Sequence, residues 1–307
     1  MTGKVALIVI YNHRYDKNIE AVEALYKDRF SHIYHLMPFY DGDRPNVIPV
    51  YENSIYFQGY VAQGFKSFFN EEYAHYFFVA DDLVLNPVVH EANYQEYLNL
   101  STDTSFLPGF VHLHKAGTWK RVSEAYSYNT KKKKVEIQTE IPSYEEALEI
   151  FSRYSIELHP VSFDQIHRKK KFFFKNEFRG HIDYWKWRFR RLKHKLKGKK
   201  PFHLSYPLVG SYADIFVISA SSIKKFCHYC GVFAATDLFV ELAIPTALVL
   251  CEERIITEEE LNLQGQPLWT EEDFKILSKY DYQLKRLISD FPQTHLYLHP
   301  IKLSKWK

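Results

Sequence analysis

The chain of 307 residues has little cysteine and no long hydrophobic run. The chain has only three cysteines, a small and odd number that does not suit a disulfide framework. Such sparse cysteine usage favours a reducing compartment. The apolar run Val5–Ile10 is too short for a signal-peptide core and is expected to be a first strand. No apolar run has the length needed to cross a bilayer. These absences argue against a disulfide-rich secreted fold and against an integral membrane protein, so we expect a cytoplasmic location.

The pair Cys227 and Cys230 has C-x-x-C spacing. A structural zinc site usually takes ligands from two such pairs, and the chain has no second pair. We therefore expect two thiols packed in a helix rather than zinc or redox chemistry.

The net charge of +3 is unevenly distributed along the chain. Residues 166–200 contain fifteen lysines or arginines against two acids, a net of +13, so the remainder of the chain carries −10. A mildly acidic body with one strongly basic segment indicates a localised anionic partner. The aromatic fraction of 17% suits broad binding surfaces or contact with a membrane interface.

Strand and helix patterns alternate over the first ninety residues. Short apolar strands are expected at Lys4–Tyr11, His32–Pro38 and Asn46–Tyr51, and helical spacing covers Asn18–Phe30 and Gly59–Phe69. This alternation predicts an α/β fold with a largely parallel, doubly wound sheet. With no internal repeat and no low-complexity linker, we expect one domain with an insertion rather than two separate domains.

An apolar strand that ends on two carboxylates is the most informative motif. The run Tyr76–Val79 is followed after Ala80 by Asp81 and Asp82. Open α/β sheets build ligand sites at the carboxyl ends of their strands, and hard divalent cations prefer carboxylate oxygens shared with phosphates. The motif predicts a metal–diphosphate site, with an ordinary acidic turn as the alternative.

Elements after residue 205 are expected to be regular. A strand is expected at Ala213–Ser219, helices at Ala220–Tyr229 and Thr236–Val249, a final long helix after Thr270 ending near Phe291, and a short strand at His295–His299. Earlier, a helix is expected to start within Val88–Leu98, and Ser143 with Glu146 forms a capping-box pattern for a helix through Tyr154.

Asp237 and Glu241 are four residues apart, so within the expected helix they share a face. The surrounding residues are strongly apolar, and burial there would raise a carboxyl pKa toward that of a general base. The alternative is a helix-terminal acid stabilised by the helix dipole and a surface glutamate.

Taken together, three features resemble nucleotide-sugar glycosyltransferases of the GT-A fold, such as those of bacterial envelope polysaccharide synthesis. They are the first strand with its Tyr11-Asn12 turn, the aromatic strand with an acidic tip, and the later segment Gly210-Ser-Tyr-Ala-Asp214-Ile-Phe-Val-Ile. The resemblance covers residues 4–90 and 205–250. It implies a Rossmann-like, mostly parallel central sheet with flanking helices and a basic, aromatic helical insertion.

The resemblance also implies roles for individual residues. In the family an Asp-x-Asp motif holds Mn²⁺ or Mg²⁺ against the donor diphosphate. Here Ala80 replaces the first acid, so Asp82 would bind the metal and Asp81 would contact the ribose or a metal-bound water. His299 is a candidate C-terminal metal ligand, and its imidazole favours Mn²⁺ over Mg²⁺; the alternative is a surface histidine before a proline turn.

Donor and acceptor contacts follow from the same resemblance. Tyr11 and Asn12 would meet the nucleotide base and ribose, with an ordinary strand-end turn as the alternative, and Asp214 would contact a sugar. Inverting members place a catalytic aspartate in a Glu-Asp pair at the start of a helix. Thr236-Asp237 matches that place, with threonine where glutamate is expected. The implied catalytic residues are Asp237 and, as a substitute, Glu241.

The resemblance divides the single domain into three parts. Residues 1–100 would form the nucleotide-donor half, residues 101–205 an insertion that contains the basic segment 166–200, and residues 206–307 the acceptor and catalytic half with a C-terminal helix and tail.

Residues 181–197 have helical periodicity, with an apolar stripe and a basic remainder. The stripe consists of Ile182, Trp185, Phe189, Leu192 and Leu196. This pattern is typical of a helix that lies in an anionic membrane interface. Many glycosyltransferases of envelope polysaccharide synthesis take lipid-linked acceptors at the cytoplasmic leaflet, so the resemblance implies a peripheral protein at the inner face of the cell membrane. RNA binding and packing against the protein's own core are the alternatives.

The sequence thus predicts a metal-assisted transferase that moves a sugar from a nucleotide-sugar donor to a glycan or lipid-linked saccharide, with inversion. One rival is a non-catalytic membrane-surface or RNA-binding α/β protein, although nucleic acid is the less expected partner. Another is a nucleotidyltransferase, which normally has a glycine-rich phosphate loop that the turn Tyr11–Arg14 lacks.

Overall fold

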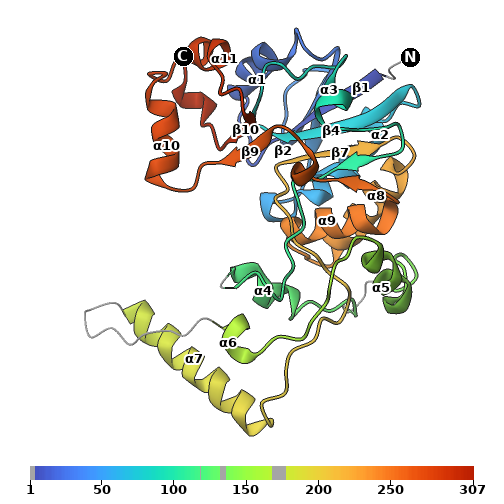
Figure 1. The fold of residues 1–307 in the computed structure, drawn as a ribbon, viewed down its shortest axis with the longest axis vertical. Coiled ribbons are helices and arrows are strands. Elements are labelled where there is room, and N and C mark those ends of the chain that lie inside the picture. The colour runs from blue at the N-terminus through green and yellow to red at the C-terminus, as the bar shows by residue number, and fades with distance from the viewer. Residues whose placement is uncertain (1–3, 118, 132–135, 168–177) are drawn as a thin grey trace. The chain divides into compact units, whose positions relative to one another are not determined.

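The computed structural model describes residues 4–117, 119–131, 136–167 and 178–307 (Figure 1). The chain forms two compact units. Residues 1–109 and 211–307 make up the first, which we call the sheet unit, and residues 110–210 make up the inserted unit. Residues 168–177 of the basic segment lie outside the described residues. Within the described ranges, no helix combines the length and the apolarity that crossing a bilayer requires.

Within the described residues, the sheet unit is built on a seven-stranded sheet with the order β3-β2-β1-β4-β7-β6-β8. In chain order these strands are β1 (Lys4–Ile10), β2 (His32–Pro38), β3 (Val47–Val50), β4 (Tyr73–Ala80), β6 (Ser105–Phe106), β7 (Ile215–Ser219) and β8 (Ile255–Ile256). Strands β1 to β4 run parallel, whereas β7 is antiparallel to both β4 and β6. The predicted α/β class with a mostly parallel sheet is confirmed.

Helices cover both faces of this sheet, as Figure 1 shows. On one face lie α1 (Asn18–Tyr26) and α3 (Tyr94–Tyr97), and on the other α2 (Gln58–Phe68), α8 (Ile223–Ala235) and α9 (Val240–Cys251). Every residue of β4 and all of β1 after Lys4 are buried, which explains why these strands are continuous apolar runs. Across the β4–β7 pair, Phe78 stacks on Phe216 with ring centroids 4.6 Å apart.

A second, smaller sheet carries the C-terminal tail toward β4. It has the order β5-β10-β9, with β5 at Val84–Leu85, β9 at Gln264–Pro267 and β10 at His295–His299. Strand β10 pairs antiparallel with β5, which follows the acidic tip of β4. Short 3₁₀ turns occupy Ser54–Tyr56, Glu258–Glu260 and Leu303–Lys305.

The helix expected from Thr236 begins instead at Val240. Helix α8 ends in a Schellman arrangement, in which Asp237 has φ 57° and its N–H donates to the carbonyl of Ala234, while the N–H of Leu238 donates to that of Phe233. Asp237 and Glu241 therefore do not share a helix face, and that prediction is wrong.

The long helix expected after Thr270 is two helices, α10 (Glu271–Ser278) and α11 (Leu284–Ser289). Asp281 and Tyr282 between them have positive φ, which no helix continues through. Lys307 forms two backbone hydrogen bonds between these helices: its N–H donates to the carbonyl of Tyr282, and its carbonyl accepts from the N–H of Leu284. The predicted caps at Ser143 and Thr270 are present, whereas the helix expected within Val88–Leu98 is only the single turn α3.

The inserted unit contains α4 (Lys120–Ala125), α5 (Tyr144–Arg153), α6 (Phe163–Ile166) and the long α7 (Phe178–Leu196). Helix α7 is anchored by a different face from the predicted stripe. Trp187 is buried, and His194 stacks between Phe163 and Phe202. The stripe itself faces solvent, with Trp185 61% and Phe189 69% exposed.

Candidate functional site

The candidate site lies where the strand order of the central sheet reverses. Strand β1 has β2 on one side and β4 on the other, and both are parallel to it. At such a point the two neighbouring loops diverge and leave a crevice at the carboxyl ends of the strands. Ile10 pairs with Ala80, so the Tyr11-Asn12 turn and the acidic tip of β4 emerge side by side.

Asp81 is buried between these two loops. Its backbone N–H donates to the carbonyl of Ile10 at 2.9 Å, and its carboxylate accepts from the N–H of Asn12 and the side-chain amide of Asn18, both at 3.4 Å. Burial, and then the neighbouring charge of Asp82, raises the pKa of Asp81 to about 7. These hydrogen bonds hold the Asp81 carboxyl beside Asn12.

Asp82 meets the C-terminal tail. The Nε2 atom of His299, on β10, lies 2.9 Å from Oδ1 of Asp82, and the backbone N–H of Ile301 donates to the carbonyl of Asp82 at 2.6 Å. Burial alone would lower the pKa of His299, but the hydrogen bond to Asp82 and the charges of Asp214, Asp82 and Asp81 raise it. The small sheet thus delivers an imidazole to the tip of β4.

Asp214 completes a group of three carboxylates around His299. It precedes β7, its backbone carbonyl accepts from the N–H of Ala80 at 2.8 Å, and its Oδ1 lies 3.8 Å from Nε2 of His299. Burial raises the pKa of Asp214, His299 lowers it and Asp82 raises it further. The structure therefore brings together four residues that the sequence singled out: Asp81, Asp82, Asp214 and His299.

Tyr212 belongs to this group and was missed by sequence reasoning. Its hydroxyl forms a hydrogen bond with Nδ1 of His299, on the ring edge opposite Asp82. Its ring stacks parallel to Tyr297 and meets the edge of Trp269, a side chain that is 67% exposed. Its hydroxyl meets His299 only because β10 lies beside β5, so no local signal in the sequence indicated it.

The remaining sequence candidates lie in different environments. The ring of Tyr11 is fully buried and its hydroxyl bonds to Nδ1 of His35 at 3.1 Å. Asn12 is half-buried beside Asp81. Asp237 is exposed in the turn between α8 and α9, whereas Glu241 is half-buried in the first turn of α9 and its charge contributes to the raised pKa of Tyr212.

Asp82 and His299 offer a carboxylate and an imidazole that could hold a divalent ion. In this structure they bond directly to each other, with Oδ1 and Nε2 2.9 Å apart. The Tyr212 hydroxyl on Nδ1 fixes the ring orientation, as partners of metal-binding histidines commonly do. The mixed oxygen and nitrogen donors fit Mn²⁺ or a similar ion.

The fold is similar to that of a solved structure. It is the apo structure of WbbM, a bifunctional glycosyltransferase, which matches 97% of this chain at 11% identity with a TM-score of 0.38. This chain spans 46% of the length of that one. No protein-family model matches the sequence, and no curated protein matches it.

Proposed function

We propose that this chain is a glycosyltransferase that uses a nucleotide-sugar donor. The observation that supports the proposal is the convergence of Asp81, Asp82, Asp214 and His299 at the reversal point of a parallel sheet. Carboxylates and an imidazole at that place suit a divalent ion and the diphosphate of a nucleotide sugar.

In this proposal Asp82 and His299 hold Mn²⁺ or Mg²⁺, and Tyr212 positions His299. The bound ion would offset the negative charge that develops on the departing diphosphate. Asp81, Asn12 and the loop around them contact the ribose. The carboxylate of Asp81 can accept a hydrogen bond from a ribose hydroxyl.

Transfer requires a proton acceptor on the acceptor side. The acceptor oxygen forms its bond to the anomeric carbon while the bond from that carbon to the diphosphate breaks, and the hydroxyl proton passes to a carboxylate. A single displacement of this kind inverts the anomeric centre. Asp237 and Glu241 are the proposed bases, and Glu241 is favoured because its backbone carbonyl accepts from the N–H of Ser211, the neighbour of Tyr212, at 2.9 Å.

We also propose that the acceptor is lipid-linked and that the protein binds the inner membrane surface through α7. The exposed stripe supports this, because aromatic and aliphatic side chains face solvent beside lysines and arginines. A groove of about 1010 Å³ along α7 mixes the same chemistries, since its lining includes Trp185, Phe189, Arg188 and Lys195. Apolar walls with cationic groups suit an anionic amphiphile such as a lipid phosphate.

A thermal-shift screen tests the enzymatic proposal. The protein is mixed with UDP, GDP or CMP, each with and without Mn²⁺. Stabilisation by one nucleotide that requires Mn²⁺, and that Asp82→Asn abolishes, supports the proposal. Asp28→Asn, at an exposed aspartate of the sheet unit, is the matched control. Absence of any response to the three nucleotides with Mn²⁺ contradicts a metal-assisted nucleotide-sugar transferase.

A further inference from the structure

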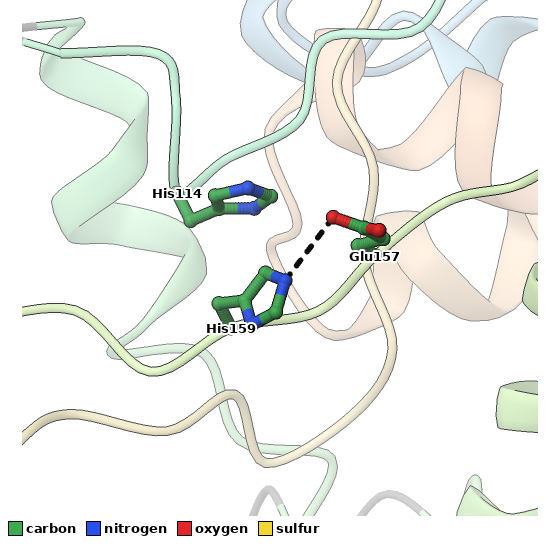
Figure 2. Close-up of side chains that lie close together, drawn as sticks. All are labelled: His114, Glu157 and His159. Carbon is green, nitrogen blue, oxygen red and sulfur yellow. Dashed lines mark hydrogen bonds and ion pairs between the residues drawn. The ribbon is translucent and has the colours of Figure 1, made fainter.

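Three side chains of the inserted unit that take no part in the proposed transfer converge on one point. They are His114, Glu157 and His159, and their ligand atoms lie within 4.8 Å of one another (Figure 2). The Nε2 atom of His159 is 3.2 Å from Oε2 of Glu157. The rings of His114 and His159 stand nearly perpendicular with centroids 4.6 Å apart.

The donor set is that of a zinc-type site, and one of its spacings already matches. Ligand atoms about 2.0–2.1 Å from a tetrahedral ion are roughly 3.3 Å from each other, and the His159–Glu157 separation is close to that value. Two imidazoles and one carboxylate favour Zn²⁺ or a neighbouring transition ion, whereas Mg²⁺ prefers oxygen donors throughout. Three protein ligands leave a fourth position for water or for another side chain.

The two chain segments that carry the ligands are fixed by hydrogen bonds to their backbones. The hydroxyl of Tyr126 donates to the carbonyl of His159 at 2.6 Å, and the side-chain amide of Gln165 donates to the carbonyl of His114 at 3.4 Å. The side-chain oxygen Oε1 of Gln165 in turn accepts from the backbone N–H of Ser162 in a capping box. The backbones of His114 and His159 are therefore each held by one side chain from a neighbouring segment.

A fourth imidazole lies close by. The ring of His112 is 5.9 Å from that of His114, and its buried Nδ1 atom has no hydrogen-bond partner among the described residues. A rotation of the His112 side chain could bring this nitrogen to the open position of the ion.

We propose that His114, Glu157 and His159 bind a transition-metal ion of the Zn²⁺ class, which ties the segment before α4 to the segment between α5 and α6. The second of these segments continues into Pro160–Gln165, which lines the groove along α7. The ion would thus stabilise one wall of that groove.

Calorimetric titration of the untagged, full-length protein with ZnCl₂ after EDTA treatment tests the proposal. Because Asp82 and His299 can also take a divalent ion, the readout is a difference: His114→Ala and His159→Ala should each bind one zinc ion fewer than the wild type. Loss of an outer-shell partner weakens metal binding by roughly tenfold to a hundredfold. If a variant still binds zinc at this site, its affinity should fall by more than that, because a direct ligand has been removed. The matched control is His203→Ala, since His203 is an exposed histidine of the same unit.

Spectra keep the proposal testable if a variant folds poorly. Co²⁺ should give the visible absorption bands of a tetrahedral site in the wild type and in the control His203→Ala, and reduced bands in the milder variant Glu157→Gln. Equal zinc stoichiometry and affinity in the wild type, His114→Ala and His159→Ala would overturn the proposal, as would a wild type that binds no zinc. The variants should keep any Mn²⁺-dependent response to nucleotide, so failure here is distinguishable from failure of the proposed transferase.

Discussion

Asp82 and His299 are 217 positions apart in the chain, yet their side chains meet at 2.9 Å. The contact depends on β10, which pairs with β5 immediately after the acidic tip of β4. The same pairing places the N–H of Ile301 on the carbonyl of Asp82. The C-terminal tail is therefore part of the candidate site rather than an appendage to it.

His299→Ala should weaken Mn²⁺ binding by more than tenfold or so, because a direct ligand is removed. It should also abolish the Mn²⁺-dependent part of any nucleotide stabilisation, measured as the shift in Tm. His295→Ala is the matched control, since His295 lies at the other end of β10 and bonds to Thr294 instead. Equal Mn²⁺ affinity in the two variants would exclude His299 as a ligand.

Tyr212→Phe should weaken Mn²⁺ binding by about tenfold to a hundredfold while the Tm without metal changes little. The substitution removes only the hydroxyl that orients the His299 ring and keeps the stacking on Tyr297. Isothermal titration with MnCl₂ measures the affinity. Tyr282→Phe is the control, because its exposed ring packs on Trp306 away from the carboxylates. A Tyr212→Phe variant with wild-type affinity would show that the hydroxyl plays no positioning role.

The parts of the fold that could be predicted are those whose sequence pattern is local. Strands β1 and β4 contain the apolar runs Val5–Ile10 and Tyr76–Val79, because both faces of the sheet are covered there. The start of α9 was placed too early because the apolar residues after Thr236 continue the helical pattern. The Thr236 hydroxyl, however, bonds back to the carbonyls of Val232 and Phe233 as α8 ends there.

The candidate site shows the same division. Asp81 and Asp82 stand out in the sequence because two acids directly follow a buried strand. The role of Tyr212 could not be predicted, because it depends on β10 lying beside β5 and on the approach of His299 to Asp214. Contacts between distant segments carry no periodic pattern, so only the folded chain reveals them.

The double variant Trp185→Ala/Phe189→Ala should reduce binding to anionic vesicles. Burial of a large apolar side chain stabilises by about 1.5–3 kcal/mol, so loss of two should weaken partitioning by roughly a hundredfold to ten-thousandfold. Vesicle sedimentation measures the effect. The matched control is Trp269→Ala, at a similarly exposed tryptophan of the sheet unit.

Salt concentration and lipid composition separate the electrostatic contribution to vesicle binding from the apolar contribution. Binding should fall as salt rises and should be weak on zwitterionic vesicles, because each lysine or arginine near an anionic surface contributes about 1 kcal/mol. Tight binding to single-stranded RNA with no binding to vesicles would instead favour the nucleic-acid interpretation of α7.

Glu252→Gln should change the pH dependence of stability. The carboxylate of Glu252 is buried at the end of α9 and accepts hydrogen bonds from the hydroxyls of Ser105 and Ser219. Burial raises its pKa, and the serine hydroxyls oppose that rise. The folded state therefore holds the proton more tightly than the unfolded state, so this carboxyl makes the protein less stable as pH rises from about 4.3, the ordinary glutamate pKa, through the raised value.

The amide of Glu252→Gln keeps an oxygen for both serines but does not ionise. The difference in Tm between this variant and the wild type should therefore shift in favour of the variant as pH rises across that window. Thermal unfolding followed by circular dichroism at several pH values measures it. The neighbouring Glu253→Gln, at an exposed position, should show no such trend. Parallel Tm–pH curves for Glu252→Gln and the wild type would mean that the buried carboxyl does not contribute to the pH dependence, whatever its burial.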